Sequence, residues 1–167
     1  VRLALALDMI HHRKPEFKGI MASVRSKLKK LFGTRQEVLP LAASGTGAMV
    51  AAVHSLFAPG ATVLGIPGGK FGERWAEIAR AHGLRPVVLE VREGYAVKPE
   101  AVAEALGKDP EIRGVLVQLS ETSTGVQHPV RELGAITSRT DVLLVVDGIS
   151  GIGICPCPMD DWKLDCV

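Results

Sequence analysis

Two stretches decide the fold: Val115-Leu116-Val117-Gln118-Leu119 and Val142-Leu143-Leu144-Val145-Val146-Asp147. Both are nearly continuous apolar runs, without the polar and apolar alternation that marks a strand with one solvated face. Strands of this kind are covered by helices on both sides, as in parallel sheets. The two stretches therefore predict strands in the middle layer of a three-layer α/β fold.

The segments around these strands alternate between helical and extended patterns. Apolar residues recur at three- and four-residue steps from Phe17 to Leu31, opposite a basic face expected to be solvated, and Gly33 is placed to end this helix. Further helices are predicted after Ser44, from 71 to 83 and from Pro99, with extended segments at 38–42, 61–66 and 86–91. We expect a mostly parallel, doubly wound sheet with helices on both faces.

Composition limits the class of protein. The 167 residues are 47% hydrophobic and 23% charged, which is typical of one globular domain with a real core. The net charge of +2 and the scattered basic residues, apart from 25–30, give no reason to expect a nucleic-acid or anionic-membrane partner. Because the chain shows neither an apolar run of about 20 residues nor a signal-peptide pattern, we expect a cytoplasmic protein that acts on small molecules.

The three cysteines predict reduced thiols. Cys155 and Cys157 are separated by a single proline, which is too close for an easy disulfide between them, and Cys166 is the third. Zinc sites usually present two spaced pairs of ligands, and no histidine lies in this stretch. No metal is therefore expected.

Ligands of parallel sheets bind beyond the carboxyl ends of the strands, so the loops after Ala43, Ile66, Leu119 and Val146 are the ones that matter. In the first loop, Ser44-Gly45-Thr46-Gly47-Ala48 enters a helix, where free backbone amides and the helix dipole suit a phosphate. The lysine and the spacing of a P-loop are missing. A turn that only caps the helix explains this loop equally well.

The second and third loops each allow two interpretations. In Gly68-Gly69-Lys70-Phe71-Gly72 a flat ligand could stack on the aromatic ring, or the ring could anchor the following helix to the sheet. In Glu121-Thr122-Ser123-Thr124-Gly125 the hydroxyl groups could bind polar ligand atoms or cap the next element.

Asp147 is a carboxylate at the end of a strongly apolar strand. Its desolvation would be costly without a cation or a hydrogen-bond donor beside it. A protonated pyridine nitrogen is one such partner. A turn capped by the carboxylate is the other interpretation.

Taken together, the four loops resemble the class V aminotransferase family, most closely its alanine–glyoxylate and serine–pyruvate branch. Residues 12–17 are similar to the early segment of that family, 44–47 to its phosphate turn, 121–126 to its strand-end loop and 145–147 to its aspartate motif. The family consists of fold type I pyridoxal-phosphate enzymes. The resemblance implies that residues 1–167 form the N-terminal part of a large cofactor-binding domain, in a homodimer.

The resemblance also implies a role for seven residues in binding pyridoxal 5′-phosphate. The amides of Thr46, Gly47 and Ala48 would hold the phosphate, Phe71 would stack on the ring, Thr122 would bond near the ring hydroxyl, Asp147 would pair with the ring nitrogen, and Ile149 would support the opposite face. Relatives often carry tryptophan at the Phe71 position and a larger polar residue at the Ala48 position, so the contacts around the ring are expected to differ. His12 and Arg13 receive no role.

The implied reaction is transamination between a small amino acid, of the alanine or serine type, and a 2-oxo acid such as glyoxylate or pyruvate. In the family, the lysine that binds the cofactor covalently follows a segment similar to 159–165, and Lys163 does not match its position. The arginine of the C-terminal domain, which binds the substrate carboxylate, has no match either. We therefore expect a fragment without transaminase activity of its own, in which an apolar strand begins at Leu164.

Two alternatives stay open at this level. The first is another fold type I pyridoxal-phosphate enzyme, such as a cysteine desulfurase or a lyase, although the resemblance suggests that desulfurases stack a histidine where Phe71 stands. The second is a Rossmann-like module that binds a nucleotide and catalyses nothing. The spectrum of a bound ligand separates them, because pyridoxal phosphate bound as an imine absorbs visible light.

Overall fold

The computed structural model describes residues 2–167 and contains the alternation that the sequence predicts. In chain order its elements are α1 (Arg2–Leu5), α2 (Pro15–Phe32), α3 (Gly45–Leu56), β1 (Thr62–Gly65), α4 (Lys70–Ala81), β2 (Arg85–Val88), α5 (Pro99–Lys108), β3 (Ile112–Gln118), β4 (Ser120–Glu121), β5 (Val126–Gln127), α6 (Val130–Thr137), β6 (Leu143–Asp147) and α7 (Met159–Trp162). The α/β class is therefore confirmed.

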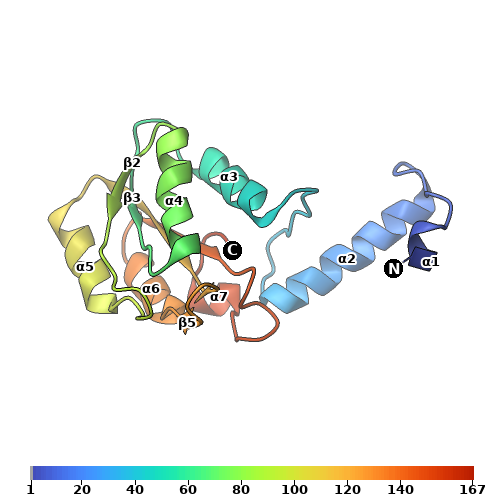
Figure 1. Cartoon of the computed structure of the whole chain (residues 1–167). Coiled ribbons are helices and arrows are strands. Elements are labelled where there is room, and N and C mark those ends of the chain that lie inside the picture. The colour runs from blue at the N-terminus through green and yellow to red at the C-terminus, as the bar shows by residue number, and fades with distance from the viewer. Residues whose placement is uncertain (1) are drawn as a thin grey trace.

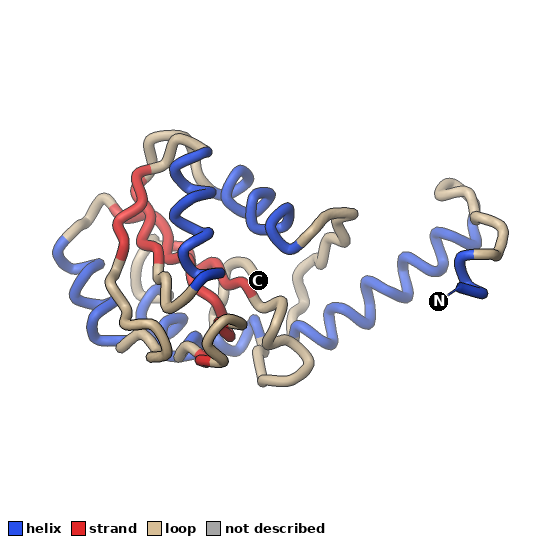
Figure 2. The backbone as a smooth tube through the Cα atoms, viewed as in Figure 1, coloured by secondary structure: helices blue, strands red, loops and turns tan. Residues whose placement is uncertain are grey.

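Four strands form one sheet in the order β2-β1-β3-β6, and every neighbouring pair is parallel. Figure 2 shows the strands in red. The register places Leu64 opposite Val115, and Val115 opposite Leu144. The short strands β4 and β5 pair antiparallel as a separate hairpin after β3. Since β1, β3 and β6 all run in one direction, their carboxyl ends meet at one edge of the sheet.

Helices cover both faces of this sheet, with α3 and α4 on one side and α5 and α6 on the other (Figure 1). Successive side chains of β3 point to opposite faces. Leu116 packs in the cluster beneath α3 and α4, whereas Val115 and Val117 pack in the cluster beneath α5 and α6. Helices shield both faces of β3 from solvent, which is why residues 115–117 are all apolar.

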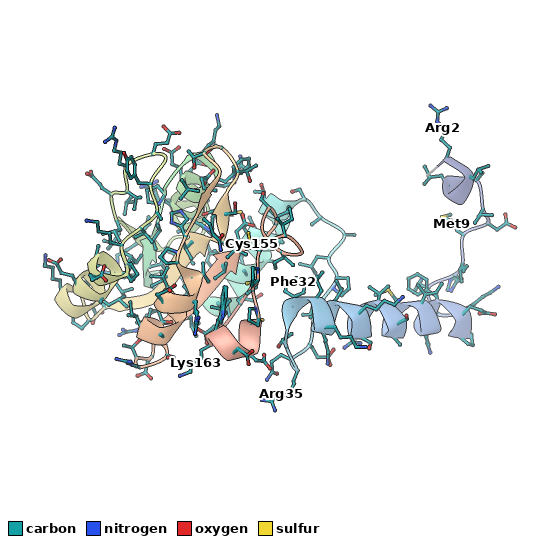
Figure 3. The ribbon with its side chains drawn as sticks, turned by 90° about the horizontal axis from the view of Figure 1, so that it is seen from below. Arg2, Met9, Phe32, Arg35, Cys155 and Lys163 are labelled. Atoms are coloured by element: carbon teal, nitrogen blue, oxygen red, sulfur yellow. The ribbon has the colours of Figure 1, made fainter. Side chains whose placement is uncertain are left out.

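The helix α2 projects from this body, as Figures 1 and 2 show. It ends as predicted at Gly33, which adopts a left-handed φ of 58° that favours glycine. Its predicted apolar stripe is present but largely uncovered, since Ile20 is 48% exposed and Leu31 is 52% exposed. In Figure 3, Phe32 marks the end of α2 at the body, and Met9 lies beyond the opposite end.

A small hydrogen-bonded joint holds the end of α2 to the body. Thr34 Oγ1 donates to Asp160 Oδ1 at 2.5 Å, and the Arg35 amide donates to Asp160 Oδ2 at 3.0 Å. The Asp160 amide in turn donates to the Gly33 carbonyl oxygen at 3.2 Å. These hydrogen bonds lower the pKa of Asp160, the bond from Thr34 most of all and against a smaller rise from burial.

The predicted strand at 38–42 is wrong, because this stretch is an irregular connection between α2 and α3. Pro40 has no N–H to donate, and Leu39 and Leu41 lie exposed rather than in the core. Apolar character alone suggested a strand there. The strand predicted from Leu164 is present as one parallel bridge between Cys166 and Val145, in which Val146 N donates to Cys166 O at 2.8 Å.

Two further observations concern residues 2–167. No helix in this part of the chain is both long and apolar enough to cross a membrane. All three cysteines are free thiols, and no group of three or more histidine, cysteine, aspartate or glutamate side chains is placed to hold a metal ion.

Candidate active site

The N-terminus of α3 is a capped helix end facing the carboxyl edge of the sheet. The Ser44 hydroxyl accepts a hydrogen bond from the Gly47 amide at 3.2 Å, and the Ser44 carbonyl accepts one from the Ala48 amide at 3.1 Å. The Thr46 amide has no acceptor within residues 2–167. Of the three predicted amides, a phosphate at this helix end would therefore find that of Thr46 free and would share the N–H groups of Gly47 and Ala48 with the cap.

Arg74 links this helix end to α4. Its Nη1 donates to Thr46 Oγ1 at 2.9 Å, and its guanidinium carbon lies 5.5 Å from the centre of the Phe71 ring. Phe71 and Arg74 are three residues apart on one side of α4, which explains their contact. No carboxylate of the described chain forms an ion pair with Arg74. Arg74 receives no role from the sequence alone, although a basic residue three positions after an aromatic residue in a helix is a usable signal.

Glu121 fixes the start of α4. Its side chain is fully buried and accepts hydrogen bonds from Gly72 N at 2.8 Å, Phe71 N at 3.3 Å, Ser123 N at 3.1 Å and Ser123 Oγ at 2.6 Å. Burial raises the pKa of Glu121, but these hydrogen bonds outweigh burial, so the pKa lies below its ordinary value. The charged carboxylate holds the backbone that carries Phe71. The sequence analysis read Glu121 only as part of a loop.

His128 connects the segment after β5 to the segment before α5 through its side chain. The Val97 amide donates to His128 Nδ1 at 3.1 Å, so a neutral ring carries its hydrogen on Nε2. That Nε2 is buried and has no hydrogen-bond partner within residues 2–167. Burial lowers the pKa of His128, against a smaller upward effect of the Glu121 charge. The ring is therefore a neutral part of the loop's packing.

Asp147 ends β6 beside Gln118, which ends β3 opposite it. Asp147 Oδ1 accepts from the Ile149 amide at 3.0 Å, and Oδ2 accepts from Gln118 Nε2 at 3.3 Å. The loop after β6 also reaches the third loop, because Ser150 Oγ forms a hydrogen bond with Thr122 Oγ1. A Cβ atom on Gly45 would lie 2.8 Å from Ile149 Cδ1, so this side chain rests against the start of α3.

The contacts join the seven predicted residues into one edge of the molecule. Arg74 bridges Thr46 and Phe71, and the loop after β6 touches Gly45, Gln118 and Thr122. A cavity of about 350 Å³ opens here, and its lining includes Ala48, Asp147 and Ile149 among mostly apolar side chains. Of the predicted residues, Thr46, Gly47, Phe71 and Thr122 lie outside that lining.

Comparison with known proteins identifies the family of this chain. The family model described as aminotransferase class-V matches residues 3–167. The chain belongs to the class V aminotransferase family. It is 37% identical to an uncharacterized aminotransferase of Methanocaldococcus jannaschii, over 97% of this chain and 42% of that protein. It is 36% identical to the serine–glyoxylate aminotransferase of Methylorubrum extorquens, over 99% of this chain and 42% of that protein.

A solved structure of the same kind agrees with the fold. The crystal structure of ureidoglycine–glyoxylate aminotransferase from Bacillus subtilis superposes with a TM-score of 0.93 at 29% identity, covering 98% of this chain and 42% of that one. The class V chain described here thus spans less than half the length of these relatives. The expected resemblance to the family is confirmed.

The cofactor of this family is pyridoxal 5′-phosphate, and the residues at the strand ends fit it. The phosphate needs hydrogen-bond donors and positive charge, and the start of α3 and Arg74 carry both kinds of group. The ring would need a flat apolar contact and an acceptor for its nitrogen, and Phe71 and Asp147 have the chemistry for these two tasks. Asp147 is the only carboxylate that lines the cavity within the described residues.

Proposed function

We propose that the protein containing this chain transfers an amino group from a small amino acid, of the alanine or serine type, to a 2-oxo acid such as glyoxylate or pyruvate. Membership of the class V aminotransferase family supports the reaction type. Its similarity to a serine–glyoxylate and a ureidoglycine–glyoxylate aminotransferase supports glyoxylate as an acceptor. The observation that carries the proposal is the single edge at which Arg74 connects Thr46 with Phe71, and the loop after β6 connects Asp147 with Gln118 and Thr122.

In this proposal each of the seven residues has one task at the cofactor. The amides of Thr46, Gly47 and Ala48 hold the phosphate, Phe71 stacks on the ring, Thr122 bonds near the ring hydroxyl, Asp147 pairs with the ring nitrogen, and Ile149 supports the opposite ring face. The bond from Ser150 keeps the Thr122 hydroxyl at the site, and the bonds to Asp147 keep its carboxylate turned toward the cavity.

When bound, pyridoxal phosphate supplies an acceptor for the electron pair that remains after the Cα–H bond of the amino acid breaks. The task of Asp147 is to accept a hydrogen bond from the ring nitrogen and so keep positive charge there. The apolar lining of the cavity excludes water around this ion pair, which strengthens it. Glu121 contributes by holding the backbone of Phe71 through hydrogen bonds.

The proposal extends to the architecture of the whole protein. Residues 1–167 would form the N-terminal part of the large cofactor-binding domain, which agrees with a chain that covers 42% of its relatives. A homodimer and a cytoplasmic location are part of the same proposal. The uncovered apolar stripe on α2 is available for a subunit contact.

Transaminase assays on the protein purified at the full length made by its source organism test the proposal. With pyridoxal phosphate and L-serine or L-alanine, glyoxylate should be converted to glycine, detected by chromatography. Asp147→Asn should lower kcat by at least about a hundredfold, because a neutral amide cannot hold positive charge on the ring nitrogen. If the protein instead releases sulfide from L-cysteine and makes no glycine, it is a desulfurase and the proposal is wrong.

A further inference from the structure

Gln118 is the neighbour of Asp147 on the adjacent strand. The parallel register places these two residues opposite each other at the ends of β3 and β6. Asp147 lines the cavity, whereas Gln118 does not and is only 1% exposed. A ligand in the cavity would thus meet the Asp147 carboxylate, which the buried Gln118 amide contacts from the adjacent strand.

The orientation of the Gln118 amide follows from the charge of its neighbour. Nε2 donates to Asp147 Oδ2 at 3.3 Å. The flipped amide would bring Oε1, an acceptor, against a carboxylate oxygen that also only accepts, so the donor must face Asp147. Since the Ile149 amide donates to Oδ1 at 3.0 Å, each carboxylate oxygen has one donor that limits its rotation.

This arrangement leaves the other end of the amide without a partner. Gln118 Oε1 is buried and accepts no hydrogen bond from residues 2–167. A buried acceptor without a donor lowers stability, and the adjacent positions Val117 and Leu119 are filled by apolar side chains. A polar side chain at position 118 thus carries a cost for folding, and its only hydrogen bond goes to Asp147.

We infer that Gln118 is a positioning residue for the cofactor: it holds the Asp147 carboxylate at the angle at which Asp147 accepts from the pyridine nitrogen. The inference rests on the proposed function, since it needs a ring nitrogen in the cavity. Gln118 itself touches no ligand and acts only through Asp147. Any protein group that donates to Oδ2 from the same buried side would serve the same purpose.

The test compares two ligands on the full-length protein. One is pyridoxal 5′-phosphate, and the other is its 1-deaza analogue, in which a C–H group replaces the ring nitrogen. Dissociation constants for both are measured by equilibrium titration for the wild type, Gln118→Met and Gln118→Leu. Gln127→Met is the matched control, because Gln127 is an exposed glutamine on the neighbouring β5. Urea unfolding of each variant shows that it is folded.

The wild type and Gln127→Met should bind pyridoxal phosphate about tenfold more tightly than the deaza analogue, because only the former offers a charge-assisted hydrogen bond to Asp147. Both Gln118 variants should lose most of this preference by weaker binding of pyridoxal phosphate alone, and should unfold at an unchanged or higher urea concentration. Equal weakening of both ligands, or an unchanged preference, overturns the role of Gln118. A wild type without any preference overturns the proposed role of Asp147 as well.

Discussion

Replacing Glu121 with glutamine should destabilise the fold far more than such a small change suggests. The Glu121 carboxylate is the acceptor for four hydrogen bonds, three of them from backbone amides or a hydroxyl within 3.1 Å. In Glu121→Gln, one carboxylate oxygen becomes an NH₂ group. If the remaining oxygen faces Ser123 and Phe71, the new NH₂ group points at the Gly72 amide. Two donors then face each other where, in the wild type, Gly72 N lies 2.8 Å from Glu121 Oε2.

The cost follows from this geometry. One buried amide left without an acceptor costs about 1–3 kcal/mol, and the loss of charge weakens the remaining bonds and the interaction with the α4 helix dipole by about 1 kcal/mol more. We expect a loss of about 3 kcal/mol in the free energy of unfolding. With a urea dependence of about 2 kcal/mol per molar, the unfolding midpoint should fall by about 1.5 M.

The assay is urea unfolding followed by tryptophan fluorescence, to which Trp75, buried on α4, and Trp162 both contribute. Glu73→Gln is the matched control, since Glu73 lies exposed in the first turn of the same helix and should change stability by less than about 0.5 kcal/mol. If both variants shift the midpoint by the same small amount, Glu121 does not hold the start of α4 in the way described.

Three further changes test other parts of the fold and site. Arg74→Gln should weaken binding of pyridoxal phosphate about tenfold in equilibrium titrations but leave binding of pyridoxal unchanged, because the guanidinium lies beside the expected phosphate position. His128, whose pKa burial lowers from its ordinary value of 6.5, binds its proton less readily in the folded than in the unfolded chain, so stability should fall as pH drops below about 6.5, by up to about 1.4 kcal/mol per pH unit. Gly114→Ala should destabilise by about 2 kcal/mol in urea unfolding, because its Cβ would lie 2.3 Å from the Phe57 ring.

Each of these predictions has its own control. Arg74→Lys keeps the charge and should retain most of the affinity, and equal weakening of pyridoxal and its phosphate would show that Arg74 acts through Phe71 instead. His128→Gln should flatten the acid side of the stability curve, and an unchanged slope would contradict the role given to burial. Gly107→Ala, in α5 with nothing within 4 Å, should stabilise by about 0.5–1 kcal/mol, opposite in sign to Gly114→Ala.

The apolar pattern was sufficient to predict the sheet but not the connection before α3. Residues 142–146 are continuously apolar because both faces of β6 are covered, and this local signal is visible without coordinates. Val38–Ala42 carries a similar signal, yet no neighbouring strand pairs with it. Whether an apolar stretch becomes a strand depends on a partner elsewhere in the chain, which composition does not reveal.

The same distinction applies to the site. Phe71, Thr122 and Asp147 could be selected because each lies at, or shortly after, the carboxyl end of a predicted strand. Gln118 looked like an interruption of an apolar run, and its contact with Asp147 depends on the register between β3 and β6, 29 residues apart. Glu121 acts on Gly72 across 49 residues. The role of a side chain that positions another residue depends on which distant segments pair. The residues next to it in the sequence therefore do not reveal that role.

The joint at Asp160 makes α2 a lever. The 18 residues of this helix span about 27 Å, and the hydrogen bonds that tie its end to the body all involve Asp160 and residues 33–35. A rotation of about 10° at this hinge would swing the Pro15 end through roughly 5 Å, as the length of such an arm dictates. The Asp160 carboxylate on α7 thus helps to fix the direction of the whole N-terminal arm, although it lies more than 120 residues away in the chain.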